Sequence, residues 1–490
     1  MKKILNKLHV PHWLCLVLVM IFLLRIPSFF EPFSYGDEMI YLTLGQAIKK
    51  GLILYKDIHD NKPPLLYFIA SLAGNVFWLK VILAFWMLAT TVLFWKLVRI
   101  FFKEKLQKIA VIFFAVLTTL PLLEGQIANA ELFMLAPTLL GFYLLFSQKK
   151  TKRNRVVLAG SLFALATLFK VPAALDMPAI VFFWLATTKL SRKNIFKIAK
   201  DTFYLLIGFS IPIAFTFVWY YSQGALADYF VAAFGQNLGY LSSFRPSDLE
   251  KSFLARNAPL LIRGGLTGLG IFLVSLFAKR KPGLSQPFIF ASILLFLNLF
   301  AITLSERPYP HYLIQYVPAV SILATMLVAA NSIEQTLVVM PLFLALLAPV
   351  YYEFWYYPSL PYYERFLKFA FGQTSRQEYF NQFDSKVTGN YAIANFIANL
   401  TRPEEKVFVW GDSAPIYALS RRLPPIKYVA DYHIRDFSSK EAVMLNLTAQ
   451  KPKLVVILPQ TESFKDLGLF VNQNYLLVAT IENAEIWKLR

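Results

Sequence analysis

The chain has 490 residues, of which 57% are hydrophobic and 16% are charged, and its mean hydropathy is +0.51. A soluble domain could not bury so much apolar surface, so lipid must cover part of it. A formal net charge of +20 would suggest nucleic-acid binding in a soluble protein. Here the basic residues follow a membrane pattern, so we expect a lipid bilayer as the partner and no nucleic acid.

Lysine and arginine gather in short breaks between apolar runs. These basic clusters occupy every second break and lie at 2–7, 103–108, 149–155, 189–200 and 279–281. Such alternation is the positive-inside pattern of membrane proteins. It predicts a multi-pass protein of the plasma membrane, with its N-terminus cytoplasmic and the part beyond the last span extracytoplasmic.

The apolar runs predict a polytopic α-helical membrane protein with about 11 spans. The first run contains Cys15, the only cysteine, which excludes an intramolecular disulfide and a cysteine metal cluster. The spans are expected at 13–30, 79–101, 109–123, 132–146, 156–169, 178–188, 203–221, 258–278, 287–304, 312–330 and 337–352. Residues 1–352 would then form the transmembrane domain.

From residue 353 onward, charged residues return and the pattern predicts a small α/β domain outside the cytoplasm. Strands are expected at 406–410, 453–458, 475–481 and 485–489, and helices at 390–400 and 440–450. Only Gly411 follows the first strand, so this domain, residues 353–490, lacks the glycine-rich loop of a nucleotide site.

The first outer loop, residues 31–78, is the most unusual connection in the chain. It holds the adjacent carboxylates Asp37 and Glu38. The amphipathic segment 38–49 should lie on the membrane as an interfacial helix that ends at Gly51. Paired carboxylates can supply a general base, although an ordinary solvated loop is the alternative.

The second half of this loop contains His59 and, shortly after it, Lys62 followed by two prolines. The prolines are typical of a helix start and predict a second interfacial segment at 65–78. Placing the next span at 79–101 keeps the basic cluster 103–108 on the cytoplasmic side. A lysine at this position can stabilise an anionic leaving group.

Other ionisable residues are expected at the outer ends of spans, among them Arg25, Glu131, Arg307 and His311. Such residues near hydrocarbon are costly and therefore indicate function. The chain has no Asp-x-Asp motif to hold a nucleotide sugar through a metal ion. A lipid-linked donor avoids that need, because lysine or arginine can neutralise its single departing phosphate.

These residues resemble a known family, the GT-C superfamily of polyprenyl-phosphate-sugar-dependent glycosyltransferases. The resemblance is to the branch of the protein O-mannosyltransferases and the bacterial aminoarabinose transferase, and it covers the N-terminal two thirds of the chain. It rests on the Asp37-Glu38 pair after the first span, the Lys62-Pro-Pro stretch, Glu131, and the Arg-Pro-Tyr-Pro-His-Tyr turn that begins at Arg307.

The resemblance implies an inverting transfer of a sugar from a polyprenyl phosphate to an extracytoplasmic lipid, glycan or protein. Asp37 matches the essential acid, Lys62 the donor-phosphate lysine and Glu131 the second acidic position. We expect Arg25 or Arg307 to assist Lys62. Where the aminoarabinose transferase has a metal-binding Glu, this chain has Asn61, so we expect no metal or other cofactor.

Several of these residues have simpler interpretations. Glu38, the other candidate for the second acidic position, is favoured at a helix N-terminus by the macrodipole, and Glu131 could cap a span. His59 and His311 could contact donor or acceptor, but polar histidines at a membrane interface are commoner. Two other functions stay open, a flippase of lipid-linked sugars and a cell-surface glycan ligase or polymerase.

Overall fold

The computed structural model describes residues 10–148, 152–239, 252–281, 283–329, 332–412 and 414–490. The expected basic residues Lys2, Lys3, Lys7, Lys149 and Lys150 lie outside this part of the chain. The chain divides into two compact units. The helical unit comprises Met1–Ile26, Leu83–Trp219 and Phe234–Ser359, and the mixed unit comprises Pro27–Ile82, Tyr220–Ala233 and Leu360–Arg490.

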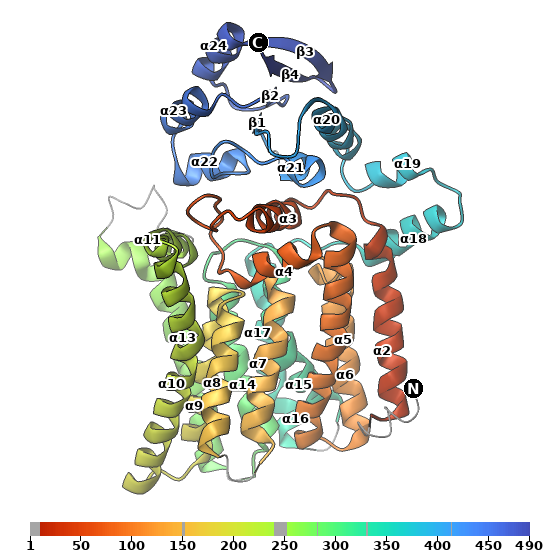
Figure 1. Cartoon of the computed structure of the whole chain (residues 1–490). Helices are drawn as coiled ribbons and strands as arrows, with labels where there is room; N and C mark the ends of the chain where they lie inside the picture. Colours follow the sequence, from red (N-terminus) through yellow and green to blue (C-terminus); the bar gives the residue numbers. More distant parts are fainter. Residues whose placement is uncertain (1–9, 149–151, 240–251, 282, 330–331, 413) are drawn as a thin grey trace. The chain divides into compact units, whose positions relative to one another are not determined.

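The helical unit is built from long apolar helices that run side by side (Figure 1). Its elements are α2 (His12–Arg25), most of α5 (Val76–Phe101), α6 (Glu104–Thr119), α7 (Ala130–Phe146), α8 (Arg153–Thr167), α9 (Asp176–Thr187), α10 (Arg192–Ser222), α13 (Phe253–Arg280), α14 (Gln286–Ile302), α15 (Val317–Val328), α16 (Ile333–Leu337) and α17 (Val339–Tyr351). Three short 3-10 helices each precede an α-helix: η2 (Pro121–Leu123) precedes α7, η3 (Val171–Leu175) precedes α9 and η7 (Pro310–Tyr316) precedes α15. Helix α14 packs against α9, α13 and α15.

Six helices of the described chain are long and apolar enough to cross a membrane. They are His12–Phe30, Val76–Phe101, Arg192–Ser222, Phe253–Arg280, Pro310–Val328 and Ile333–Tyr351. Four shorter apolar helices accompany them: Ala130–Phe146, Val171–Thr187, Leu226–Gly235 and Gln286–Ile302. The class predicted from the sequence, a multi-pass helical membrane protein, is confirmed, whereas the count of eleven spans stays a prediction.

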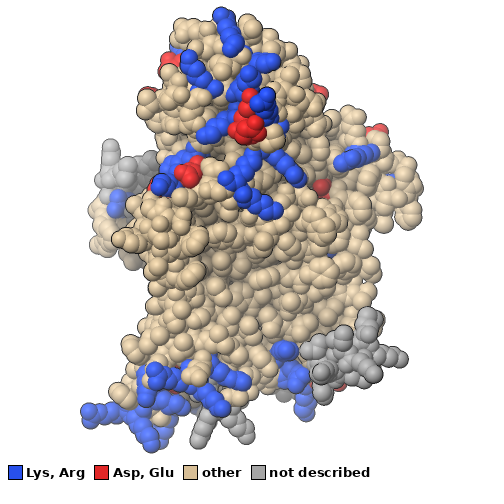
Figure 2. Space-filling model, in the orientation of Figure 1, with Lys and Arg blue, Asp and Glu red and all other residues tan. Residues whose placement is uncertain are grey.

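Basic side chains gather at one end of the helical unit. Figure 2 shows lysine and arginine concentrated where α6, α8 and α10 begin, and few charged side chains on the visible face along the helices. Large apolar side chains such as Phe203, Phe215 and Phe272 are exposed on that surface. A water-facing protein would bury such residues, so this surface is suited to lipid.

The mixed unit contains a four-stranded sheet with strand order β1-β2-β4-β3. The strands are β1 (Val407–Trp410), β2 (Leu454–Ile457), β3 (Tyr475–Ile481) and β4 (Ala484–Leu489), and all four confirm strands expected from the sequence. β1 and β2 are parallel, with Val407 opposite Leu454, while β4 is antiparallel to both β2 and β3. The hairpin between β3 and β4 turns at Glu482 and Asn483, both of which have positive φ angles, as a tight two-residue turn requires.

Helices complete the mixed unit. They are α3 (Gly36–Lys49), α4 (Leu65–Ala73), α11 (Leu226–Phe230), α18 (Ser359–Ala370), α19 (Arg376–Asn381), α20 (Val387–Leu400), α21 (Ala414–Ser420), α22 (Asp431–Phe437), α23 (Lys440–Gln450) and α24 (Lys465–Asn474). The core between sheet and helices includes Phe408, Val455, Leu447 and Phe470. The predicted α/β character of this C-terminal part is therefore confirmed.

Two expectations for the first outer loop need correction. Helix α3 packs against both α4 and α21, and residues 38–47 are all buried, so it does not present one free apolar face to lipid. The second segment ends at Ala73 instead of continuing to residue 78. Gly74 there adopts φ 71°, which favours glycine, and the Asn75 side chain accepts a hydrogen bond from the Trp78 amide as α5 begins.

Candidate active site

Asp37 and Lys62, the predicted base and the predicted phosphate-binding lysine, meet in the mixed unit. Asp37 lies in the first turn of α3, and Lys62 lies in the loop that precedes α4. The Lys62 Nζ atom is 3.3 Å from Asp37 Oδ2. The side chain of Asp37 is 30% exposed and that of Lys62 is 25% exposed. The pair is therefore held by the protein and still open to a substrate.

Tyr41 holds this pair in place. It lies one helical turn after Asp37, where side chains meet on one face of a helix. Its hydroxyl donates a hydrogen bond of 2.9 Å to the same Asp37 oxygen that Lys62 contacts. The Lys62 ammonium also lies 5.0 Å from the centroid of the Tyr41 ring, a favourable cation–π distance.

Two further tyrosines fix the backbone of Lys62. The Tyr55 hydroxyl donates to the Lys62 carbonyl at 2.7 Å, and the Lys62 amide donates to the Tyr67 hydroxyl at 3.3 Å. Tyr55 itself is fully buried among Tyr220 and Tyr229, with ring centroids 5.4 Å away in both cases. The backbone of Lys62 is therefore hydrogen-bonded on both its carbonyl and its amide, which fixes the position from which the side chain projects.

Asp60 extends this hydrogen-bond network, because it accepts from Tyr67, which in turn accepts from the Lys62 amide. It is buried, and its carboxylate accepts hydrogen bonds of 2.7 Å from the Tyr67 hydroxyl and from the Asn61 amide. Burial and the neighbouring Asp60 raise the pKa of Tyr67 well above its usual value, so Tyr67 remains a donor. His433 of α22 places its Nε2 atom 3.6 Å from Asp60.

His433 and His59 pack in the same region. Burial lowers the pKa of His433, and this effect outweighs the opposite influence of Asp60. The His59 amide donates to the Lys427 carbonyl at 2.8 Å, and its ring contacts Tyr428 and Phe437 at centroid distances of 5.1 and 5.2 Å. His59 thus joins the first outer loop to the C-terminal segment, which agrees with a packing role.

Glu38 has a separate partner, Lys80. The Lys80 ammonium lies 2.8 Å from Glu38 and 2.8 Å from Glu31, and all three side chains are almost fully buried. Glu31 also accepts a 2.6 Å hydrogen bond from the Tyr362 hydroxyl. Neighbouring helical residues point about 100° apart, so Asp37 and Glu38 serve different environments. Glu38 therefore belongs to a buried ion-pair network apart from the Asp37–Lys62 pair.

The helical unit contains a second cluster of ionisable residues. Glu131 is paired with Lys170, and its carboxylate lies 3.7 Å from His311 Nε2. The other ring nitrogen of His311 is hydrogen-bonded to the buried carboxylate of Glu124. The Lys170 ammonium lies 3.5 Å from the centroid of the Tyr312 ring. Glu124, Glu131 and Lys170 lie at or next to the ends of α6, α7 and α8 opposite the basic end of the unit. His311 and Tyr312 lie in η7.

The two predicted arginines have different surroundings. Arg25 is 1% exposed and donates hydrogen bonds of 2.8 Å to the carbonyls of Gly125 and Thr118. It fastens the end of α2 to the connection between α6 and α7, so we assign it to structure and not to donor binding. Arg307 is exposed in the turn before η7.

Sequence reasoning missed several residues of these networks, among them Tyr41, Tyr67, Lys80 and His433. Lys80 left a readable signal, because a lone lysine within an apolar run must find a partner to be tolerated there. Tyr41 follows Asp37 at helical spacing. Nothing in the local sequence indicated His433. Among the described residues, no group of three or more His, Cys, Asp or Glu side chains could hold a metal ion.

Comparison with known proteins relates the chain to a family and to a fold. Residues 61–220 match the family model described as dolichyl-phosphate-mannose-protein mannosyltransferase. No curated protein sequence matches the chain. ArnT from Cupriavidus metallidurans bound to undecaprenyl phosphate is 15% identical, with a TM-score of 0.56 and coverage of 97% of both chains.

Two further solved structures resemble the chain. The apo state of the same ArnT is 16% identical, with a TM-score of 0.52 and coverage of 97% of both chains. The archaeal oligosaccharyltransferase AglB from Archaeoglobus fulgidus is 14% identical, with a TM-score of 0.46, and the match covers 92% of this chain and 70% of that one. The ArnT fold therefore extends over nearly the whole length of this chain.

Proposed function

We propose that the chain is a membrane glycosyltransferase of the GT-C superfamily that moves one sugar from a polyprenyl phosphate to an extracytoplasmic acceptor. The match of residues 61–220 to the mannosyltransferase family model and the fold shared with ArnT support this proposal. The observation that carries the residue assignment is the contact of 3.3 Å between Lys62 and Asp37. It brings a carboxylate and an ammonium side by side, which supports a role of Asp37 as the base and of Lys62 as the cation at the donor phosphate. The undecaprenyl phosphate bound to ArnT and the description of the matching family support the kind of donor.

In the proposed reaction, Asp37 accepts the proton of the acceptor hydroxyl or amine. The acceptor's lone pair attacks the anomeric carbon as the bond to the phosphate oxygen breaks. The bonding electrons leave with the phosphate, whose charge Lys62 neutralises. A single displacement of this kind inverts the anomeric carbon. Tyr41 keeps the carboxylate oriented, since its hydrogen bond to Asp37 does not depend on Lys62.

The helical unit supplies the remaining assignments. We propose Glu131 as the second acidic position, with its orientation fixed by Lys170. Arg307 is the candidate second cation for the donor phosphate, and its exposure supports that role. His311 is held between Glu124 and Glu131, and we propose it as a contact of the donor or the acceptor.

The proposed topology has eleven spans and a cytoplasmic N-terminus in the plasma membrane. Residues 1–352 form the transmembrane part, with the outer-face loop 31–78, and residues 353–490 form the extracytoplasmic domain. The basic end of the helical unit supports this orientation (Figure 2). A reporter that fluoresces only in the cytoplasm, fused after Leu489, should stay dark, and a bright signal would contradict the topology.

The experiment that tests the function uses purified protein in lipid vesicles with a radiolabelled polyprenyl-phosphate sugar. Envelope extract from cells lacking the protein supplies the acceptors and is afterwards separated into lipid, glycan and protein fractions. Label that moves onto a fraction supports the transferase. Translocation of the donor without transfer supports the flippase instead, and transfer of a whole chain, measured by product size, supports a ligase or polymerase.

A further inference from the structure

The mixed unit contains an open cavity of about 930 Å³ beside its sheet. It lies where the parallel strands β1 and β2 end, because Trp410, the last residue of β1, and Asp412 after it line the cavity, and so do Leu458 and Gln460 after β2. Ligands of open α/β sheets bind outside the carboxyl ends of parallel strands. The volume is also within the usual range for a ligand pocket.

Gly411 allows the two strand ends to form this cavity. It follows β1 with φ 132°, and a Cβ atom at this position would lie 2.9 Å from the side chains of Leu458 and Thr461. Any other residue would therefore push apart the segments that follow β1 and β2. The backbone of this site is built around one glycine, although it lacks the phosphate-binding glycine loop.

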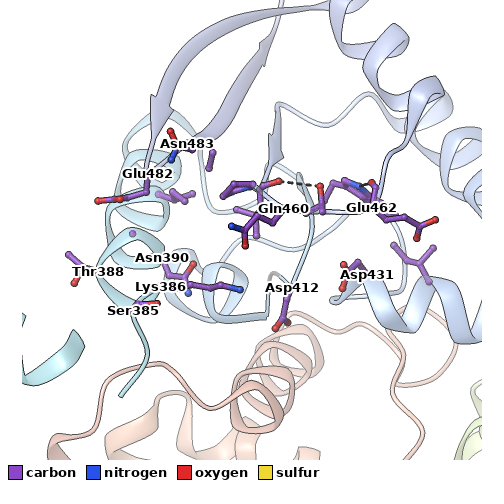
Figure 3. A pocket seen from close by; sticks show the side chains of 18 of the residues that line it. Ser385, Lys386, Thr388, Asn390, Asp412, Asp431, Gln460, Glu462, Glu482 and Asn483 are labelled. Atoms are coloured by element: carbon purple, nitrogen blue, oxygen red, sulfur yellow. Dashed lines mark hydrogen bonds between the residues drawn. The ribbon is translucent and has the colours of Figure 1, made fainter. Parts of the chain in front are cut away.

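Polar side chains from four segments surround the same space. Figure 3 shows Lys386 before α20, Asp412 after β1, Asp431 at the start of α22 and Gln460 after β2. Asn390 and Asn483 add two side-chain amides. Carboxylates accept hydrogen bonds and amides both donate and accept them, so this lining suits a ligand with several hydroxyl groups.

The charges of the lining argue against a phosphorylated ligand. Four carboxylates line the cavity (Asp412, Asp431, Glu462 and Glu482), against three cations (Lys386, Arg435 and Lys440). One of the cations, Lys440, is already paired with Glu462 at 2.5 Å. A phosphate would therefore meet a surplus of negative charge, whereas the hydroxyls of a neutral sugar would not.

Helix α22 connects this cavity to the candidate active site. Asp431, Ile434 and Arg435 share one face of the helix and line the cavity. His433 lies on the opposite face and approaches Asp60, and Phe437 contacts His59. The cavity and the Asp37–Lys62 pair thus belong to one compact unit, and α22 lies between the cavity and the loop that carries Lys62.

We propose that this cavity binds the saccharide part of the acceptor, an assignment that rests on the proposed function. Neutral sugar hydroxyls would bind between Lys386, Asp412, Asp431 and Gln460, and α22 would hold the acceptor in a fixed relation to Asp37. The lipid-linked sugar donor has the same hydroxyl chemistry, so the test must distinguish the two sources.

The first test measures binding alone. Full-length protein in lipid nanodiscs is mixed with neutral trisaccharides of glucose, mannose, galactose and N-acetylglucosamine, and saturation transfer to their ring protons is recorded by NMR. At least one should receive saturation, and Asp412→Asn and Asp431→Asn should each weaken the effect. Asp466→Asn, an exposed position on α24 outside the cavity, is the matched control and should behave as wild type.

Absence of saturation for all four sugars, or an unchanged signal in both cavity variants, would overturn the proposal. Amide hydrogen exchange in β1 and β2 verifies that each variant is folded. The second test uses the transferase assay, where the cavity variants should raise the acceptor KM about tenfold, as expected for loss of a good hydrogen bond, and leave the donor KM unchanged.

A raised donor KM with an unchanged acceptor KM would assign the cavity to the donor and overturn the acceptor role. These experiments can refute the sugar site and the proposed transferase function independently of each other. Sugar binding that depends on Asp412 and Asp431 without any transfer would refute the proposed function and retain the sugar site. Transfer with a normal acceptor KM in both variants would retain the proposed function and refute the acceptor role of the cavity.

Discussion

Lys62 and Asp37 are 25 positions apart in the sequence, yet the lysine ammonium lies 3.3 Å from the carboxylate. The pairing neutralises two partly exposed charges before substrate arrives. When a donor phosphate draws Lys62 away, Tyr41 still holds Asp37 by its 2.9 Å hydrogen bond. Donor binding would thereby free the Asp37 carboxylate to accept the proton of the acceptor. This gives a physical reason for the donor to bind before the acceptor reacts.

Replacement of the base should abolish most of the turnover. Asp37→Asn keeps the size of the side chain and removes its basicity, so transfer should fall by roughly 10²–10⁴-fold, the usual worth of a positioned base. Donor binding and expression should stay near wild type. Steady-state transfer of radiolabelled sugar measures the change.

The comparison variant for this prediction is Glu38→Gln. Because Glu38 is buried against Lys80, its replacement should lower stability more than the rate of the folded fraction. Near-normal transfer by Asp37→Asn, together with an inactive but folded Glu38→Gln, would mean that the other carboxylate is the base. Activity in both variants would refute the mechanism.

Removal of the lysine charge should weaken the contact with the donor phosphate. A charge-assisted hydrogen bond contributes about 1.5–3 kcal/mol, so Lys62→Ala should reduce donor affinity or rate at least tenfold, by about 1.4 kcal/mol per decade. Lys62→Arg should recover part of the loss, since it keeps the charge. An alanine variant that equals wild type in both donor KM and kcat would leave Lys62 without a role in transfer.

Lys80 should be essential for stability and not for chemistry. Lys80→Met leaves Glu31 and Glu38 facing each other in a buried site, and breaking a buried ion pair costs about 3–5 kcal/mol. Thermal unfolding in detergent should show a large fall in Tm. Adding Glu31→Gln and Glu38→Gln to Lys80→Met should restore much of it, and a triple variant no more stable than Lys80→Met would contradict the electrostatic cause.

The stability of the mixed unit should depend on pH through His433. Burial lowers the pKa of His433 below its ordinary value of 6.5, so the unfolded chain binds this proton more readily than the folded one. Stability should therefore be complete above about pH 6.5 and decrease as the pH falls below it. Hydrogen exchange in β1 and β2 between pH 7.5 and 5 measures the effect.

His433→Phe should flatten this pH dependence, because the titrating group is gone. His12→Gln, at an exposed position on α2, is the control and should retain it. An unchanged slope in His433→Phe would assign the pH dependence to other groups.

Transfer should survive metal chelation. Asn61 stands where a metal-binding Glu is expected in the resembling transferase, and the described residues offer no cluster of three ligands. Activity in EDTA should therefore equal activity without it. Complete loss that added divalent metal reverses would reveal ligands outside the networks described above.

The sequence by itself determined the helical membrane class, the strands of the C-terminal domain and the start and end of α3 within two residues. It also singled out Asp37 and Lys62. These features depend on periodicity and on neighbours within a few positions, such as the apolar runs and the glycine after α3. The second segment ends at Ala73 because Gly74, a helix-ending residue, follows it, so its end is also local in origin.

Only the tertiary structure decided which charges meet. Lys80 pairs with Glu38 and so separates it from Asp37, and Arg25 is committed to backbone carbonyls. His433 reaches Asp60 from the far end of the chain. A charge in a low-dielectric interior requires a partner, but several partners satisfy that need equally well in the sequence. Packing of distant segments selects one of them, and local sequence carries no record of that choice.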